Sequence, residues 1–376
     1  MFQLTDCFRH FILRRKNTVK VLLAMSGGVD SSVAAALLKD KGYEVSGITM
    51  RICSDEDFSS KRTQHGCYGP GEKDDIEDAR NVAESLGIPF HTFDLIDEYK
   101  TEVLDYFLRE YQSGKTPNPC LRCNSRVKFG ALFRRARESG VEFDYFASGH
   151  YAKTVYDESS KRYQLKKAKD ARKDQSYFIS MLSQEQLSHL LLPIGDYTKT
   201  EVRAMAADFN LVTRDKPESQ DFIAGGYSSL IGEASRGQIL DKQGNVIGEH
   251  RGIPFYTIGQ RKRLGVQTKE PLYVTEIDPD NNAIIVGNRE ESFHDEFTAS
   301  ELNWISVEKL EQPIKAKVKI RYAHTAAEAT VTPVEEDRVF VEFEKPQRAI
   351  TPGQAAVFYR DETVLGSGTI ERERKQ

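Results

Sequence analysis

The chain has 376 residues, of which 39% are hydrophobic and 29% are charged, and its formal net charge is −4. This charge excludes a globally basic protein, so any RNA contact must come from local patches. The length predicts two or three domains of about 100–200 residues each. No apolar run approaches the roughly 20 residues needed to cross a bilayer, so we expect no membrane partner. The apolar core of residues 1–19 is too short and too broken for a secretory signal, and no small-residue cleavage site follows, so these residues are interpreted as an extension.

The stretch from Lys20 to Gly42 is expected to organise the rest of the chain. Val21–Met25 is a short apolar run typical of a strand buried on both faces of a parallel sheet. The small-residue loop Ser26–Ser32 follows, and a helix is predicted from Val33 to Gly42. A loop of this kind at a helix N-terminus is a phosphate site, because backbone N–H groups and the helix dipole both favour an anion. The loop lacks the lysine of G-x-x-x-x-G-K-[ST], so the usual P-loop is excluded.

The segments up to residue 150 alternate between strand and helix patterns. Strands are predicted over Glu44–Met50, Pro89–Leu95 and Asp144–His150, and helices over Asp74–Leu86, Ile96–Tyr111 and Ser125–Ser139. The alternation predicts an α/β domain with a doubly wound parallel sheet. Ligands of such sheets bind at the carboxyl ends of the strands.

The pattern changes after Tyr151. We predict a hairpin over Ala152–Tyr156 and Arg162–Lys167, helices over Ser183–Leu191 and Thr198–Asn210, and short strands within Gly237–Gly265. Nearly every segment from Pro271 onward is strand-like, which predicts a small β-barrel at the C-terminus. A hairpin is predicted over Pro271–Gly287, and further strands are predicted over Lys315–Tyr322, Glu328–Val334, Asp337–Phe343, Ala355–Arg360 and Val364–Ile370. The predicted domains are therefore an extension over 1–19, a nucleotide domain over 20–222, a small central β domain over 223–290 and a barrel over 291–376.

The five cysteines, Cys7, Cys53, Cys67, Cys120 and Cys123, are an odd number and predict a reduced, cytoplasmic protein. Two of them lie in TPNPCLRCN, residues 116–124, directly before the predicted basic helix. The N-terminus of that helix, with Arg122 and Lys128, would lower the pKa of a thiol. A reactive thiolate pair, half of a zinc site and iron–sulfur ligation all remain open, although a Cys₄ zinc site is disfavoured because the chain contains no second C-x-x-C.

Two resemblances narrow the function. The loop SGGVDSS resembles the SGGxDS loop of the PP-loop ATP pyrophosphatases, which cleave ATP between the α and β phosphates. The ordered set SGGVDSS, TPNPCLRCN, ASGHY, KDQSYF, ESQD, YTIGQRKRLG, KIRY and TPGQAAVFY is similar to that of the tRNA-specific 2-thiouridylase family, from Lys20 to the end of the chain. That family adenylates O2 of the wobble uridine in tRNA, releases pyrophosphate, and replaces the oxygen with sulfur.

The resemblance implies ATP and Mg²⁺ as cofactors and assigns the site residues. It implies that Cys123 is the nucleophile and that Asp30 helps to bind Mg²⁺. The implied ATP contacts are Ala24, Met25, Ser26, Gly27, Gly28, Val29, Asp30, Ser31, Met50 and Gly149. The implied tRNA contacts are Asn118, Pro119, Cys120, His150, Lys173, Asp174, Gln175, Arg321, Tyr322 and Gln354. The implied partners are wobble-uridine tRNAs and an upstream sulfur donor such as a cysteine desulfurase or sulfur-relay protein.

The chain departs from the family pattern in its cysteines. Better-known members carry a persulfide cysteine two residues after the SQD motif, whereas Ser219–Asp221 is followed here by Phe222, Ile223 and Ala224. We therefore expect Cys67, Cys120 and Cys123 to bind a 4Fe–4S cluster whose open iron holds sulfide, with Cys53 as an alternative to Cys67. The rival interpretation is that Cys120 or Cys123 carries the sulfur and the other thiol resolves it.

Ordinary structural roles compete with several of these assignments. His150 could be a hydrogen-bonded residue at a sheet end, Arg321 and Tyr322 could be barrel surface, and Lys173–Gln175 could cap the next helix. Two other functions are also open. One is a PP-loop ligase or synthase acting on a small molecule, which gives no reason for TPNPCLRCN, and the other is a tRNA-binding protein without catalytic activity.

Overall fold

The computed structural model describes residues 18–54, 67–217, 228–266 and 268–372. The chain forms two compact units. One contains Met1–Glu98 and Asn124–Ala224, and the other contains Tyr99–Cys123 and Gly225–Gln376. The predicted fold class, a parallel α/β domain followed by a small β domain and a C-terminal barrel, is confirmed.

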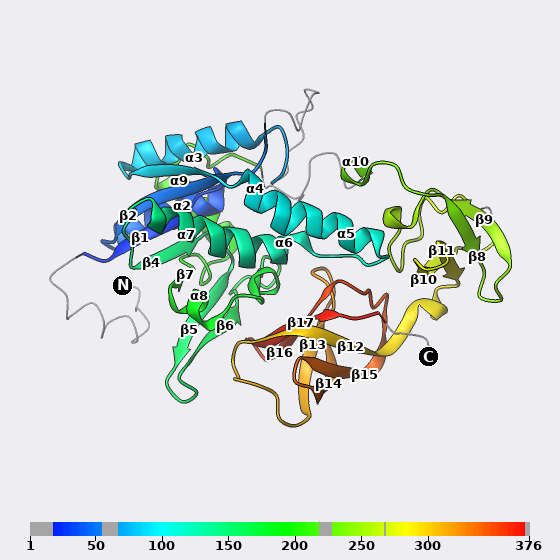
Figure 1. Cartoon of the computed structure of the whole chain (residues 1–376). Helices are drawn as coiled ribbons and strands as arrows, with labels where there is room; N and C mark the ends of the chain where they lie inside the picture. The colour runs from blue at the N-terminus through cyan, green and yellow to red at the C-terminus, as the bar shows by residue number, and fades with distance from the viewer. Residues whose placement is uncertain (1–17, 55–66, 218–227, 267, 373–376) are drawn as a thin grey trace. The chain divides into compact units, whose positions relative to one another are not determined.

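The first unit is built on a parallel sheet with the strand order β3-β2-β1-β4-β7 (Figure 1). Its strands are β1 (Lys20–Ala24), β2 (Glu44–Arg51), β3 (Phe90–Asp94), β4 (Tyr145–Ser148) and β7 (Leu190–Leu191). The register places Ala24 beside Ile48 on one side and beside Ser148 on the other. The segments that follow β1, β2 and β4 therefore leave the sheet at the same edge, as predicted.

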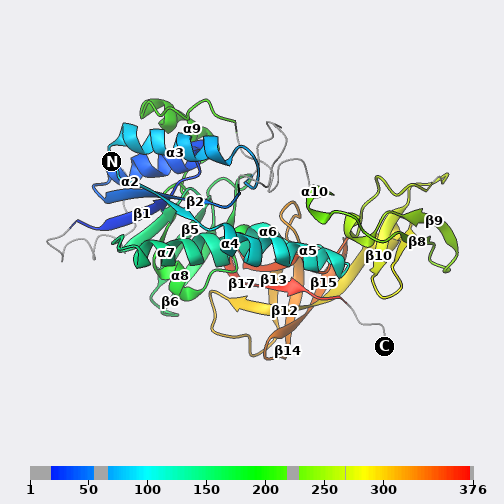
Figure 2. The same ribbon diagram turned by 45° about the horizontal axis from the view of Figure 1, so that its top comes forward.

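Helices cover both faces of this sheet (Figure 2). On one face lie α2 (Val29–Asp40), α3 (Glu72–Leu86) and α9 (Lys199–Asp208), whose buried residues share a core with Val21 and Leu23 of β1. On the other face Phe146 of β4 stacks on Phe133 of α7 (Leu132–Glu138), with 4.0 Å between the ring centroids. Alternate residues of the central strands thus pack on opposite helical layers, which explains their continuous apolar pattern.

The remaining elements of the first unit follow β4. Strands β5 (Ala152–Asp157) and β6 (Arg162–Lys167) form the predicted hairpin. The helix predicted up to Leu191 was wrong at its end, because α8 (Gln184–Ser188) stops earlier and Leu190–Leu191 pairs with β4 as strand β7. Both α8 and α9 begin with a capping box, at Ser183 and Thr198 respectively. These caps set the observed starts one residue after the predicted ones.

Helix α3 begins two residues before its predicted start, and two other predicted helix starts were wrong by a turn or more. Helix α2 begins at Val29 and not at Val33, because Gly28 occupies the N-cap position with an extended backbone. The helix predicted from Ser125 begins at Pro119, since Asn118 caps it through its side-chain oxygen and a proline at the first position favours a start there. Asp30 and Cys120 consequently lie within the first turns of helices and not in loops.

The second unit contains two β domains and a helical segment. The helical segment runs through a π-helical stretch Lys100–Asp105, α5 (Tyr106–Gln112) and α6 (Pro119–Arg122). The smaller domain contains α10 (Ser228–Ile231) and a sheet of order β10-β11-β8-β9, made of β8 (Gly237–Leu240), β9 (Val246–His250), β10 (Tyr273–Asp278) and β11 (Ala283–Gly287). The predicted hairpin from Pro271 to Gly287 is β10–β11.

The C-terminal domain is a closed barrel. Its strands are β12 (Phe293–Trp304), β13 (Ile314–Lys319), β14 (Ala327–Glu335), β15 (Arg338–Arg348), β16 (Ala355–Arg360) and β17 (Thr363–Ile370). They pair in the order β12-β15-β14-β13-β16-β17, and β12 also pairs with β17, which closes the sheet on itself. Closure leaves no unpaired edge among these strands.

None of the helices in the described part of the chain has the length and apolar character required to cross a membrane.

Candidate active site

The nucleotide loop lies between β1 and α2 and is held by its own serines. The Ser31 hydroxyl donates to the Gly28 carbonyl at 3.2 Å and accepts from the Ser26 N–H at 3.3 Å. Ser32 donates to the same carbonyl at 2.8 Å. Ser31 and Ser32 are buried, whereas Ser26 is exposed. The serines therefore shape the loop, and its accessible groups are at Ser26, Gly28 and Asp30.

The glycines of this site allow close approach of backbones. Gly27 has a φ of 69° and packs against the Asp75 carbonyl of α3. At Gly149, just after β4, an added Cβ would lie 2.7 Å from the Ser31 nitrogen. A larger residue at either position would displace the loop. Gly28 cannot cap α2 through a side chain, so the first-turn N–H groups face the loop and fit an anion such as a phosphate.

Asp30 is surrounded by donors from distant parts of the chain. Its Oδ1 accepts a hydrogen bond from the Tyr151 hydroxyl at 2.8 Å and forms an ion pair with Lys199 at 2.7 Å. The Asp30 side chain is 32% exposed. A carboxylate oxygen is a suitable Mg²⁺ ligand, which is the role that the family resemblance implies for Asp30.

His150 follows Gly149 and is neutral at physiological pH. Its Nδ1 lies 2.8 Å from the Ser148 hydroxyl, and its ring lies 5.7 Å from that of Phe129. Burial, and to a smaller extent the nearby Lys128 ammonium, holds the pKa of His150 well below its ordinary value. His150 therefore offers a hydrogen bond and an aromatic face to a ligand, but no positive charge.

The segment Lys173–Gln175 packs beneath the same strand end. The Asp174 carboxylate is buried and accepts hydrogen bonds from the Ala168 N–H and the Ser176 hydroxyl. The Gln175 side-chain oxygen accepts from the Tyr151 N–H at 2.8 Å. These contacts connect the segment to Tyr151, and through its hydroxyl to Asp30.

Cys120 and Cys123 lie in the first turns of the helix that begins at Pro119. Both are half-buried, and a π-helical segment, Cys123–Ala131, starts at Cys123 itself. A π-helical stretch leaves backbone carbonyls without their usual partners and is frequent at functional sites. Gln186 compensates for this, because its Nε2 donates to the Ser125 carbonyl at 3.0 Å and to the Phe129 carbonyl at 2.8 Å. Sequence reasoning missed Gln186, although its place in the capping box of α8 marked it as ordered.

Arg122, which lies between the two cysteines in the chain, is paired with Glu102. Its guanidinium donates to the Glu102 carbonyl at 3.1 Å and to the Glu102 carboxylate at 3.0 Å. The same group lies 4.8 Å from the ring centre of Tyr106, whose pKa is raised to about 12 chiefly by burial. These contacts hold the Arg122 side chain against the π-helical stretch Lys100–Asp105.

Gln354 lies next to the segment before the cysteines. Its Nε2 donates to the Thr116 carbonyl at 2.8 Å and to the Pro117 carbonyl at 3.4 Å. The backbone N–H of Thr116 in turn donates to the Pro352 carbonyl at 2.8 Å. The barrel motif TPGQ, residues 351–354, and the motif TPNPC, residues 116–120, are thus brought together within the second unit.

The other cysteines differ in their surroundings. Cys67 is exposed, whereas the Cys53 thiol is buried and donates to the Gly69 carbonyl. The backbone N–H groups of Ile52 and Cys53 donate to Glu72, and burial raises the pKa of this carboxyl. Cys7 and the SQD motif at Ser219–Asp221 lie outside the described residues. Within the described ranges, no three His, Cys, Asp or Glu side chains group so as to hold a metal ion, and the predicted iron–sulfur cluster is therefore unsupported.

Arg321 and Tyr322 follow the end of β13 at Lys319. Arg321 donates to the carbonyls of Arg348 and Ala349, at 3.0 and 3.4 Å, and so holds a backbone turn in place. Tyr322 is 39% exposed, and the Lys319 ammonium lies 5.1 Å from the centre of its ring. An exposed aromatic ring beside a cation is a surface on which a base can stack.

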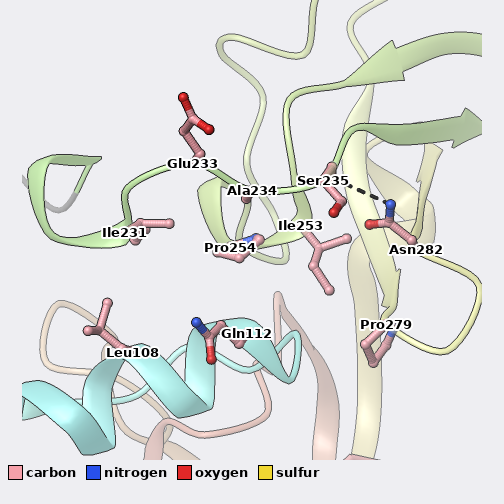
Figure 3. Close-up of a pocket in the computed structure, with 10 residues that line it drawn as sticks. All are labelled: Leu108, Gln112, Ile231, Glu233, Ala234, Ser235, Ile253, Pro254, Pro279 and Asn282. Carbon is pink, nitrogen blue, oxygen red and sulfur yellow. Dashed lines mark hydrogen bonds between the residues drawn. The ribbon is translucent and has the colours of Figure 1, made fainter.

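A cavity of about 450 Å³ lies in the second unit, away from any residue that sequence reasoning selected (Figure 3). Leu108 and Gln112 of α5 face Ile231 and Pro254 across it, and Asn282 donates to the Ser235 carbonyl at its far end. The residues that line the cavity are both polar and apolar, and they come from α5 and from the small β domain.

Comparison with known proteins agrees with this arrangement. Three family descriptions match: the tRNA methyl transferase HUP domain over residues 19–224, the tRNA methyl transferase PRC-barrel domain over 228–288, and the aminomethyltransferase β-barrel domain over 294–370. The tRNA-specific 2-thiouridylase MnmA of Acetivibrio thermocellus is 45% identical, over 94% of this chain and 99% of the relative. The MnmA proteins of Symbiobacterium thermophilum and Clostridioides difficile are 48% and 44% identical, each over 94% of this chain, and over 92% and 98% of the relatives respectively. The chain belongs to the tRNA-specific 2-thiouridylase family, MnmA.

Proposed function

We propose that this protein uses ATP to adenylate O2 of the wobble uridine in tRNA and then installs sulfur at C2, releasing AMP and pyrophosphate. The observation that carries the proposal is an anion-fitting loop with Asp30 at its helix start, in a chain that matches family members over 94% of its length. The chemistry requires activation because a urea-like carbonyl oxygen is a poor leaving group, whereas AMP is a good one.

The described residues of the nucleotide site have separable roles in this proposal. Backbone N–H groups at Gly28 and in the first turn of α2 hold phosphate oxygens, and Asp30 holds Mg²⁺, which neutralises the phosphate charge when it is bound. Met50 and Gly149 border the nucleotide at the ends of β2 and β4. The neutral His150 accepts or donates one hydrogen bond to the substrate without a change of charge.

For sulfur transfer we propose that Cys123 carries a persulfide and that Cys120 resolves it. Residues three apart on a helix lie on the same face, and these two are both half-buried near the start of one helix. The terminal persulfide sulfur attacks C2, and AMP leaves with the original oxygen. The Cys120 thiolate then attacks the Cys123 sulfur, which forms a Cys120–Cys123 disulfide and leaves the terminal sulfur on C2. An external thiol reductant restores the dithiol.

Spectroscopy and metal content separate this route from the three-cysteine cluster. The dithiol route requires no iron, so protein purified without iron and loaded with persulfide thiolates tRNA in a single turnover. Activity that appears only after anaerobic reconstitution with iron and sulfide, with a matching Mössbauer signal, would instead support the cluster. The Cys67→Ala variant is the matched control, because it removes a cluster ligand and leaves the dithiol intact.

The proposed partners are wobble-uridine tRNAs and an upstream persulfide donor, such as a cysteine desulfurase or a relay protein, in the cytoplasm. The proposed tRNA contacts are Asn118, Pro119, Cys120, His150, Lys173, Asp174, Gln175, Arg321, Tyr322 and Gln354. The domain boundaries at residues 19/20, 222/223 and 290/291 also stay proposals.

The deciding test measures 2-thiouridine in wobble-uridine tRNA, by mass spectrometry of digested tRNA from cells with and without the gene. We expect the modification to disappear and to return with the intact gene but not with Cys123→Ala. In vitro, Cys123→Ala is expected to keep tRNA-dependent ATP–pyrophosphate exchange while losing thiolation. Intact 2-thiouridine in the deleted cells, with no tRNA dependence of exchange, would refute the proposal and favour a small-molecule ligase.

A further inference from the structure

The nucleotide loop contains no lysine, yet the fold brings one to it. Lys199, the first residue of α9, lies 2.7 Å from Asp30 through its Nζ, although the two residues are 169 positions apart in the chain. The Lys199 side chain is 11% exposed. A lysine this close to the loop, and this little exposed, is unusual because lysine ammonium groups are normally solvated.

The backbone around Lys199 is fixed by several hydrogen bonds. Thr198 and Glu201 form a capping box at the start of α9. The Lys199 N–H also donates to the Asp170 carboxylate at 3.1 Å. The side chain is thus directed towards Asp30 by an ordered helix start, and little conformational entropy remains to be lost when it binds a ligand.

The ammonium of Lys199 lies beside the Asp30 carboxylate and the Tyr151 ring. Asp30 Oδ1 accepts from both Lys199 and the Tyr151 hydroxyl, and the Tyr151 ring centre lies 5.8 Å from Lys199 Nζ. An ammonium has three N–H donors, so it can bind Asp30 and a phosphate oxygen at the same time. Together with the Mg²⁺ proposed at Asp30, the ammonium would offset the repulsion between the Asp30 carboxylate and the triphosphate that the loop is proposed to bind.

We infer that Lys199 is a phosphate-binding residue of this site and contacts the pyrophosphate part of ATP. It would play the role of the lysine in the G-x-x-x-x-G-K-[ST] loop of other nucleotide-binding proteins. The inference rests on the proposed adenylation. It extends the nucleotide site from the strand edge of β1, β2 and β4 to the N-terminus of α9. Lys199 also holds the Asp30 carboxylate in position through their ion pair, in addition to binding phosphate.

The test uses Lys199→Met, with Lys169→Met as the matched control. Lys169 pairs with Glu201, near the start of the same helix, but its side chain is 48% exposed. The first measurement is the KM for ATP in tRNA-dependent ATP–pyrophosphate exchange. The second is the inhibition constant of inorganic pyrophosphate for tRNA thiolation. Neither depends on the fraction of protein that is active. We expect both to rise at least about ten-fold in Lys199→Met and to stay within about two-fold in Lys169→Met, as for loss of a charged hydrogen bond.

A measurement on the unaltered protein covers the case in which Lys199→Met does not fold. Amine acylation followed by peptide mass spectrometry is run with and without magnesium pyrophosphate. Protection of Lys199, but not of Lys169, is expected. Absence of this protection, or an unchanged pyrophosphate inhibition constant in folded Lys199→Met, would overturn the inference. An unaltered protein with no tRNA-dependent exchange would refute the proposed function instead, and the acylation result would still decide whether Lys199 binds pyrophosphate.

Discussion

Gln354 donates a hydrogen bond from its side-chain nitrogen to the carbonyl oxygen of Thr116 at 2.8 Å, across 238 positions of the chain. Thr116 begins the motif TPNPCLRCN, which contains Cys120 and Cys123. Gln354 of the barrel domain therefore positions the backbone that precedes both thiols. Each neutral hydrogen bond of this kind contributes about 1 kcal/mol. The contact gives Gln354 an intramolecular role in addition to the tRNA contact that the sequence resemblance implies.

Gln354→Ala is therefore expected to lower the thiolation rate at least about five-fold and the free energy of unfolding by about 1–2 kcal/mol. Gln354→Glu should behave in the same way, because a carboxylate cannot donate to a carbonyl. Single-turnover thiolation and chemical denaturation measure the two effects, with the exposed Gln243→Ala as control. A large loss of tRNA affinity with unchanged stability would show that Gln354 acts on tRNA directly.

Gly149→Ala is expected to impair ATP use. The added methyl group would lie 2.7 Å from the Ser31 nitrogen and 2.8 Å from the Asp30 carbonyl carbon, so the loop or the end of β4 must shift. We expect a rise of about ten-fold or more in the KM for ATP and a loss of about 1–3 kcal/mol in stability. Gly71→Ala is the control, since its added methyl meets nothing within 4 Å. Equal kinetics for the two variants would contradict the proposed packing.

The stability of the protein is expected to fall as the pH drops below about 6.5, in part because of His250. Its Nδ1 accepts from the Gly252 N–H at 3.0 Å, and its Nε2 lies 3.0 Å from the Asn282 carbonyl. Burial lowers the pKa of His250, although the bond to Asn282 opposes this. The unfolded chain therefore binds a proton at a higher pH than the folded chain does, so stability is lost as pH falls below the unfolded value.

Urea denaturation at pH 7.5 and pH 5.5 measures this effect. His250→Asn keeps an acceptor for the Gly252 N–H and cannot titrate, so its stability should change less between the two pH values than that of the unaltered protein. The exposed His294→Asn serves as the comparison. An identical pH dependence in His250→Asn and the unaltered protein would show that His250 does not contribute.

Tyr322→Ala and Arg321→Ala are expected to differ in their effects on the stability of the protein. Tyr322 is exposed, so its removal should weaken tRNA binding by about 1–3 kcal/mol, through loss of stacking, and leave stability nearly unchanged. Arg321 holds the carbonyls of Arg348 and Ala349, so its removal should also destabilise the barrel. Filter binding at fixed salt and thermal denaturation separate the two. Unaltered tRNA affinity in Tyr322→Ala would remove the stacking role.

The sequence predicted the elements whose signals are local. The capped helices α8 and α9, the hairpins β5–β6 and β10–β11, and strands β1 to β4 of the parallel sheet all carry short-range patterns. Strand β7 was missed, because Leu190–Leu191 lies in a segment that was predicted to be helical. Strand β12 was missed, because its buried positions do not alternate regularly and its pairing with β15 shifts register near His294. The helix start at Pro119 was missed although its signals, an Asn cap and a following proline, were present.

By itself, the sequence determined the fold class and the nucleotide loop, because buried strands, glycine loops and helix caps depend on residues close together in the chain. Only the tertiary structure decided which distant groups complete the site. It brought Lys199 and Tyr151 to Asp30, Gln354 to Thr116, and Gln186 to the π-helical segment after Cys123. It also paired Arg122 with Glu102. Such contacts join residues that are far apart in sequence, and their distances follow from the packing of whole elements, which no local pattern encodes.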